Sequence, residues 1–294
     1  PLVFGNNDTP GVMLSSAAKE YIKVYGVLVG KKPLIFTNND SGYETAIEFK
    51  KNGVNPLILD TRKEPSSDII TEAKNLGIEI KYSYVVVAAK GYKKVKSADI
   101  AKISDNKKDL SNIENIECDC ICVSGFWTPS IHWASQSGNK SEFNEKIDAF
   151  IPKKSKQKEN TIGSANGKFT LEETINEAFN KGYEVSNKIT ENNNKVSIPT
   201  VVEKKSSEHD KFWCVPLPKG KSYKRFLDFQ NDVAVTDIEL ALREGFRSIE
   251  HVKRYTTLGM ATDQGKTSNL NGLQLVSDIE NKVVPQVGHT TFRP

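Results

Sequence analysis

The stretch PLIFTNNDSGYETAIEFKKNGVNPLILDTRKE, residues 33–64, decides the fold class. Its first apolar run, Leu34–Phe36, predicts a buried strand that leads into a polar turn. Apolar residues then recur at helical spacing up to Gly53, and a second apolar run closes on Asp60. This order of strand, turn, helix and strand predicts the opening half of a doubly wound α/β domain.

The segments that follow extend the α/β pattern. A helix is predicted near Asp68–Leu76, strands within residues 78–103, and a buried strand in CDCICVSGFWTPS, residues 118–130. Residues 162–186 predict a glycine turn that opens a helix. Residues 187–211 are rich in lysine, serine and asparagine without periodicity, and they predict an interdomain linker.

Composition and charge argue against two classes of protein, those that bind nucleic acids and those that span a membrane. The chain has 294 residues, 37% apolar and 27% charged, with a formal net charge of +4. The lysines are scattered among acids, which argues against nucleic-acid binding. No apolar run approaches the roughly 20 residues needed to span a bilayer, so no membrane segment is expected. Both ends have the character of a piece of a longer polypeptide, and four cysteines without a disulfide framework favour the cytoplasm.

The turn TNNDSG is a degenerate form of the dinucleotide-binding turn. The three glycines of G-x-G-x-x-G fall on Thr37, Asn39 and Gly42, so only the glycine that allows close helix–strand packing is retained. Asp60, 18 residues past Gly42, is near the position that takes ribose hydroxyls. Asn39, Ser41, Gly42 and Asp60 are therefore candidate cofactor contacts. Two interpretations stay open: direct dinucleotide binding, or a Rossmann-like domain that no longer holds a nucleotide.

A second glycine turn, IGSANG, resembles the flavoprotein turn that meets the ribityl chain of FAD. Its candidate cofactor contacts are Gly163, Ser164, Asn166 and Gly167. Ser164 replaces the aspartate of that turn, which argues against FAD here. The helix N-terminus and Asn166 still suit a nucleotide.

The spacing of the cysteines and histidines along the sequence does not match that of metal-binding motifs. Alternation along one strand predicts that Cys118, Cys120 and Cys122 share a face, with neighbouring sulfurs roughly 6–7 Å apart. That separation is too long for a disulfide, and we expect these residues and Cys214 to be small buried hydrophobes. The four histidines are dispersed, and we expect structural roles for His132, His209, His251 and His289.

Several long segments resemble the alpha subunit of heterotetrameric sarcosine oxidases. They cover most of the chain outside the linkers: NNDTPGVML (6–14), FTNNDSGYETA (36–46), GFWTPSIHWASQSG (125–138), GSANGKF (163–169) and DFQNDVAVTDIELALREGFRSIEHVKRYTTLGMATDQGKTSN (228–269). The resemblance implies a two-dinucleotide-domain fold like that of pyridine nucleotide-disulfide oxidoreductases, followed by a small helical domain.

The domain plan implied by the resemblance has six parts. Residues 1–26 end an upstream FAD/NAD-type domain, 27–118 form an inserted Rossmann-like domain, and 119–186 return to the first domain. Residues 187–211 are the linker, 212–282 the helical domain, and 283–294 the lead-in to an aminomethyltransferase domain.

The resemblance also implies cofactors, partners and an activity. NAD would be held mainly by an upstream motif and capped by residues 163–167. A beta subunit would carry FAD and FMN, with gamma and delta subunits completing the complex, and tetrahydrofolate would bind a downstream domain. The complex would oxidise sarcosine to glycine with hydrogen peroxide as a product and pass the one-carbon unit to tetrahydrofolate. A subunit of N-methylglutamate dehydrogenase and a non-catalytic scaffold remain alternatives, since the amine substrate would bind the beta subunit.

The helical domain resembles bacterioferritin-associated ferredoxin, whose cysteines hold a [2Fe–2S] cluster. The ligand positions fall here on Asp228, Gln230, Asp263 and Ser268, none of which is a thiolate. We therefore expect the fold without iron, with Gly259, Gln264 and Gly265 shaping the loop that follows the second helix. No catalytic residue is assigned, and Arg254, Lys266 and Thr267 are expected to be solvated.

Overall fold

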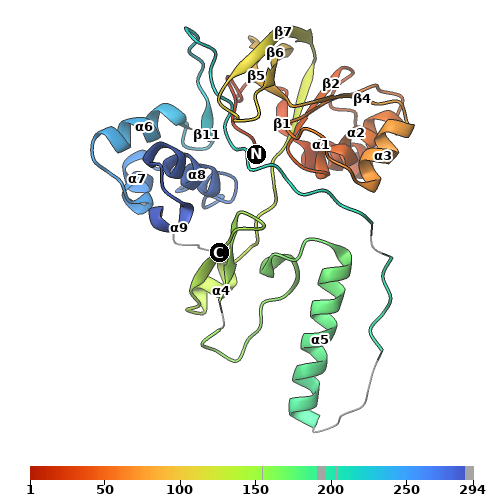
Figure 1. Cartoon of the computed structure of the whole chain (residues 1–294), viewed down its shortest axis with the longest axis vertical. Coiled ribbons are helices and arrows are strands. Elements are labelled where there is room, and N and C mark those ends of the chain that lie inside the picture. The colour runs from red at the N-terminus through yellow and green to blue at the C-terminus, as the bar shows by residue number, and fades with distance from the viewer. Residues whose placement is uncertain (154, 191–196, 203, 289–294) are drawn as a thin grey trace. The chain divides into compact units, whose positions relative to one another are not determined.

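Figure 1 shows the computed structural model of the chain, which describes residues 1–153, 155–190, 197–202 and 204–288. The chain divides into two compact units. Of the described residues, the first comprises 1–126 and 205–288, and the second those between 127 and 204. In the described residues, no helix is both long enough and apolar enough to cross a bilayer.

A five-stranded parallel sheet forms the centre of the first unit. Its order is β1 (Val12–Leu14), β8 (Cys120–Ser124), β2 (Pro33–Thr37), β3 (Leu57–Asp60) and β4 (Glu79–Tyr82). The crossover helices are α1 (Ser15–Tyr25), α2 (Ser41–Lys51) and α3 (Asp68–Asn75). The predicted α/β class with a parallel sheet is confirmed. Strand β8 pairs with both β1 and β2, so this sheet takes strands from all three of the ranges 1–26, 27–118 and 119–186.

The two faces of the sheet are covered by different elements. On β2, Ile35 packs with the apolar sides of α1, α2 and α3. Leu34 and Phe36 point the other way, toward a three-stranded antiparallel sheet of β5 (Tyr84–Gly91), β6 (Val95–Ile103) and β7 (Leu110–Glu117). The sequence did not predict β7, because most of its side chains are polar and exposed.

The cysteines differ in part from the prediction. Cys118, Cys120 and Cys122 are buried and free, as expected of small hydrophobes. However, Cys120 and Cys122 face the helices, whereas Cys118 packs with the antiparallel sheet. The prediction of a shared face was wrong for Cys118 because β8 begins only at Cys120, so strand alternation does not extend back to it.

The remaining part of the first unit is the predicted helical module. A short hairpin, β11 (Phe226–Asp228) with β12 (Val233–Ala234), leads into α6 (Val235–Arg243), α7 (Ile249–Thr256), α8 (Asn269–Glu280) and α9 (Val284–Val287). Apolar positions of α6, α7 and α8, among them Ile238, Val252 and Val276, are fully buried. The module therefore has a core without needing a metal.

The second unit holds smaller elements. They are α4 (His132–Gln136), the hairpin β9 (Ser141–Asn144) with β10 (Ala149–Pro152), a 3₁₀ turn η1 (Gly163–Asn166) and α5 (Leu171–Thr190). Helix α5 runs four residues further than the predicted helix, into the predicted linker. In this described stretch, no side chain of α5 is buried.

Candidate functional site

The turn between β2 and α2 is built on close packing at Gly42. A Cβ atom at this position would stand 2.6 Å from Cβ of Thr37 and 2.7 Å from its hydroxyl oxygen. No other residue type fits without moving the helix away from the strand. The retained glycine of the degenerate motif thus keeps α2 against β2.

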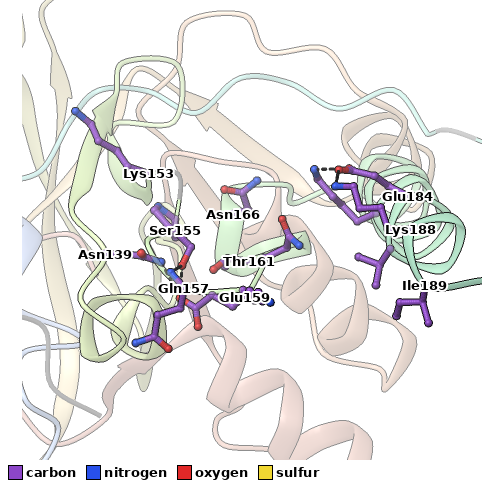
Figure 2. A pocket seen from close by; sticks show the side chains of 15 residues that line it. Asn139, Lys153, Ser155, Gln157, Glu159, Thr161, Asn166, Glu184, Lys188 and Ile189 are labelled. Atoms are coloured by element: carbon purple, nitrogen blue, oxygen red, sulfur yellow. Dashed lines mark hydrogen bonds and ion pairs between the residues drawn. The ribbon is translucent and has the colours of Figure 1, made fainter.

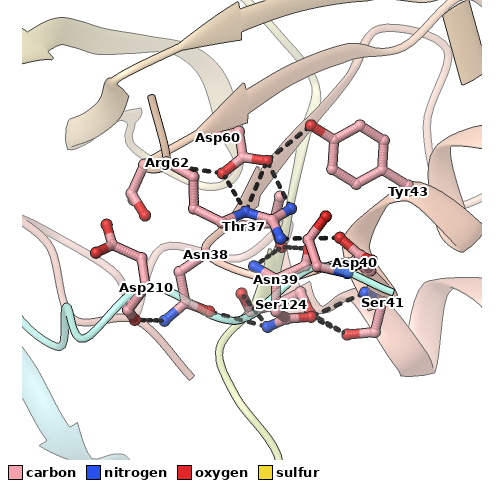
Figure 3. Close-up of polar contacts among 12 residues, drawn as sticks. Thr37, Asn38, Asn39, Asp40, Ser41, Tyr43, Asp60, Arg62, Ser124 and Asp210 are labelled. Carbon is pink, nitrogen blue, oxygen red and sulfur yellow. Dashed lines mark hydrogen bonds and ion pairs between the residues drawn. The ribbon is translucent and has the colours of Figure 1, made fainter. Parts of the chain in front are cut away.

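Asn39 closes the same turn from within (Figure 3). Its carboxamide oxygen accepts from the Ser41 backbone N–H at 2.8 Å, and its Nδ2 donates to the Ser124 carbonyl at 3.4 Å. The hydroxyl groups of Ser41 and Ser124 lie 2.7 Å apart. An N–H group at the start of a helix is the usual donor for a phosphate. Here the donor at Ser41 already has a partner, and the carboxyl ends of β2 and β8 are bridged.

Asp60, at the carboxyl end of β3, lies in a buried ionic cluster (Figure 3). Its carboxylate accepts from Arg62 Nη2 at 2.8 Å and from the Tyr43 hydroxyl at 2.7 Å. The side chain of Asp60 is 0% exposed and that of Arg62 is 8% exposed. A second nitrogen of Arg62, Nη1, donates to Asp40 at 2.8 Å. Both acids near the turn are therefore neutralised by one arginine, and Asp60 presents no surface to a ribose.

The cluster shifts the ionisation of its members. Burial, reinforced by the negative charge of Asp60 and by the hydrogen bond to it, raises the pKa of Tyr43 far above its ordinary value. Burial alone would lower the pKa of Arg62, but hydrogen bonds and charges from Asp60 and Asp40 raise it further. The phenol stays neutral and the guanidinium stays charged at every physiological pH.

Residues 205–213, which we call the strap, run across this edge of the sheet. The Asp210 N–H donates to the Asn38 carbonyl at 2.8 Å, and Asn38 Nδ2 donates to the Asp210 carbonyl at 2.9 Å. The Ser207 N–H donates to Asp40 at 2.9 Å, and Arg62 Nη1 donates to the Glu208 carbonyl at 3.1 Å. The end of the predicted linker is thus bonded to the turn.

The second predicted turn lies in the other unit and is closed by a carboxylate from α5. Glu177 accepts from the Gly163 N–H and from Asn166 Nδ2, each at 2.7 Å. Gly163 and Gly167 both have positive φ, +66° and +77°, which only glycine adopts readily. Ser164 is exposed.

A cavity of about 970 Å³ lies beside this turn (Figure 2). Asn166 lines it, together with residues of α5 and of the loop that follows β10. Lys181 and Lys188 also line the cavity, and both are hydrogen-bonded to the Glu184 carboxylate. The cavity therefore has polar donors, although these two lysines are paired.

Three of the four cluster-ligand positions of the helical module make side-chain hydrogen bonds, whereas the fourth, Ser268, is buried and its hydroxyl group has no hydrogen-bond partner. Asp228 accepts from the N–H groups of Gln230 at 2.9 Å and Gly259 at 2.8 Å. The Gln230 side chain accepts from the Thr262 hydroxyl at 2.6 Å. Asp263 accepts from the Gly265 N–H at 3.0 Å. The two loops that would bind a cluster are thus joined to each other directly.

The histidines among the described residues lie in separate segments. His132 starts α4 and is buried, and the ring of His209 lies 5.7 Å from that of Phe126. His251 is exposed, as are Arg254, Lys266 and Thr267, whereas His289 lies outside the described residues. Within the described residues, no three metal-binding side chains come together.

Sequence reasoning missed the partners of the predicted residues. Arg62 carried a signal, because a basic residue two positions after the strand-end acid is placed to pair with it. Asn38, Glu177 and the strap carried none, since their partners are distant in sequence.

Comparisons with known proteins agree with this architecture. The family described as the sarcosine oxidase A3 domain matches residues 222–294. Sarcosine oxidase subunit alpha of Rhizobium meliloti (strain 1021) is 35% identical over the whole chain, which spans 28% of that protein. The same subunit of Corynebacterium sp. (strain U-96) is 30% identical, again over the whole chain and 31% of the relative.

The chain is a homologue of sarcosine oxidase subunit alpha. The homology covers all of the chain but only about three tenths of these relatives. Among solved structures, an L-proline dehydrogenase from P. horikoshii matches with a TM-score of 0.59 and 20% identity, over the full chain and 54% of that protein. This likeness shows the fold alone: an α/β architecture with a parallel sheet, to which the helical module is joined.

Proposed function

We propose that this chain is the part of an oxidoreductase alpha subunit that helps to hold NAD and docks a flavin-carrying partner. The intact complex would oxidatively demethylate sarcosine to glycine, with hydrogen peroxide as a product and tetrahydrofolate as the one-carbon acceptor. The observation that carries the proposal is the 35% identity to a sarcosine oxidase alpha subunit over the whole chain. The free cysteines fit a reducing cytoplasm.

The residues of the second unit suit a role at the edge of a nucleotide site. The turn 163–167 presents a backbone N–H and a carboxamide that already bind a carboxylate, so this donor set accepts an anionic or hydroxyl-rich group. Glu177 brings to the turn the carboxylate that Ser164 does not supply, and we propose that it accepts from ribose hydroxyls. We propose that this turn caps an NAD molecule held mainly by an upstream motif.

The flavin chemistry is proposed to belong to the partner. FAD and FMN on a beta subunit would supply hydride acceptance and reoxidation, and gamma and delta subunits would complete the assembly. In the described part of this chain, the buried Asp60 and Arg62 pair with each other, and no three metal-binding side chains come together. Orienting and docking roles therefore fit these residues better than proton transfer.

A scaffold without NAD is the second candidate. It is favoured by one observation, the closure of the first predicted turn by Asn39 and of the second by Glu177. It would keep the docking role and lose the cofactor.

The test is made on the intact complex. The subunits are co-expressed, the complex is denatured, and released NAD is quantified by enzymatic cycling. One NAD per alpha subunit supports the proposal, and none supports the scaffold. Turnover is then measured with sarcosine and with N-methylglutamate, and oxidation of only the latter would contradict the proposed substrate.

A further inference from the structure

The strap lies where a nucleotide would lie in an open parallel sheet. In such sheets, ligands bind outside the carboxyl ends of the strands, at the point where strand order reverses. Here that point falls between β2 and β8, since β3 continues the sheet on one side and β1 on the other. Asn38 directly follows β2, and Ser124 is the last residue of β8. The side chain and the carbonyl of Asn38 form hydrogen bonds with the strap.

The contacts of the strap begin at the start of α3. The Asp68 N–H donates to the Lys205 carbonyl at 3.1 Å, and the Lys205 N–H donates to the Asp68 carboxylate at 3.0 Å. The chain then passes the Asp40–Arg62 pair, which holds Ser207 and Glu208. The strap is therefore anchored at the ends of two neighbouring strand–helix units.

The second half of the strap is held by side chains of residues 27–118, which we call the Rossmann unit. Asn38 Nδ2 donates to the carbonyls of Asp210 at 2.9 Å and Phe212 at 3.3 Å. The ammonium group of Lys107 contacts the Asp210 carboxylate at 2.6 Å. Phe212 then enters the apolar core beneath, where it is 4% exposed. A polar backbone docked over an apolar anchor is how a bound peptide is held.

The groups that would bind a phosphate and a ribose are already used. The Ser41 N–H bonds to Asn39, and the Asp60 carboxylate bonds to Arg62 and Tyr43. A dinucleotide would have to displace the strap and then break buried pairs, whose charges are costly to leave without partners.

We propose that residues 205–213 act as an intramolecular peptide ligand. They occupy the position at the carboxyl ends of β2 and β8 where a dinucleotide would bind. The Rossmann unit serves as a docking domain that fixes the segment leading into the helical module, and it does not bind a dinucleotide. This inference goes beyond the proposed function and does not depend on it, because NAD in the intact protein is assigned elsewhere.

Hydrogen exchange on the 294-residue chain and on the intact complex tests this directly. Peptides covering 205–213 are expected to exchange slowly, and neither NAD nor NADP at millimolar concentration is expected to change them or residues 37–42. Faster exchange of the strap on adding nucleotide, or new protection of residues 37–42, would overturn the inference. Absence of NAD from the complex would contradict only the proposed function.

Two strap variants give a second, independent measurement. Asn38→Ala removes two donors to the strap, and Asp210→Ala removes the contact with Lys107. Each is expected to raise exchange of residues 205–213 at least about tenfold, since a lost hydrogen bond of about 1.4 kcal/mol corresponds to that factor. Glu208→Ala is the matched control, because Glu208 contacts Arg62 through its carbonyl.

Wild-type exchange rates in both variants would show that the crevice does not hold the strap and would overturn the proposal. Variants that fail to fold leave the wild-type comparison with and without nucleotide as the deciding result.

Discussion

Arg62 neutralises Asp60 inside the protein. The Nη2–Oδ2 distance is 2.8 Å, and the same guanidinium reaches Asp40 at 2.8 Å through Nη1. The end of β3, where a ribose-binding acid would stand, is therefore a structural ion cluster. The Rossmann unit therefore keeps the fold of a dinucleotide-binding domain, while the acid at its ribose-binding position is used in a structural ion pair.

Removing the arginine is expected to destabilise the first unit strongly. Arg62→Met leaves Asp60 buried without its charge partner, and a broken buried pair costs about 3–5 kcal/mol. The free energy of unfolding, measured by urea denaturation, is expected to fall by about that amount. Lys63→Met is the control, since Lys63 is exposed. A loss in Arg62→Met no larger than in the control would contradict the ionic role.

Gly42 is expected to tolerate no side chain. In Gly42→Ala, the new Cβ stands 2.6 Å from Cβ of Thr37, so α2 must shift from the sheet. We expect a loss of about 1–3 kcal/mol, typical of overpacking, in the same denaturation assay. Gly182→Ala, on α5 with open space around it, is expected to be neutral or stabilising. Equal stability of the two variants would refute the close packing.

Alkaline pH is expected to weaken the first unit through its buried thiols. Burial raises the pKa of Cys118 from its ordinary value near 9 to about 12. Above pH 9 the unfolded chain loses this proton while the folded chain keeps it, so folding stability falls as pH rises toward 12. The unfolding free energy, measured from pH 7.5 to about 11, is expected to fall less steeply in Cys118→Ala. Parallel curves for the two proteins would contradict the shift.

The helical module is expected to depend on Asp228. In Asp228→Asn one acceptor oxygen becomes a donor, so either the N–H groups of Gln230 and Asn231 or that of Gly259 lose their acceptor. The expected cost is about 1–3 kcal/mol, read from thermal or urea unfolding. Asp232→Asn is the matched control because Asp232 is exposed and asparagine tolerates its positive φ of 52°. A variant as stable as the control would show that the carboxylate does not join the two loops.

Iron is not expected in the purified protein. The four ligand positions offer two carboxylates, an amide and a hydroxyl, which bind iron–sulfur clusters poorly compared with thiolates. Iron and acid-labile sulfide are to be assayed after anaerobic purification and reconstitution. Stoichiometric amounts of both would disprove the metal-free assignment.

The strand–helix–strand core could be predicted from sequence because its signals are local. The apolar runs 34–36 and 57–59 and the helical spacing between them are properties of neighbouring residues, and they predicted β2, α2 and β3. The retained glycine likewise indicated close packing. Local pattern failed where strands are polar, as in β7, and where an element starts late, as β8 does after Cys118.

The sequence by itself determined the α/β class, the helical module and the kinship with sarcosine oxidase alpha subunits, because each rests on residues adjacent in the chain. Only the tertiary structure decided what occupies the predicted cofactor turn. Asn38 and Asp210 are 172 residues apart, and Asp40 and Ser207 are 167 apart. A hydrogen bond between such residues has no local signature, since it exists only after the sheet has brought the strand ends and the strap together.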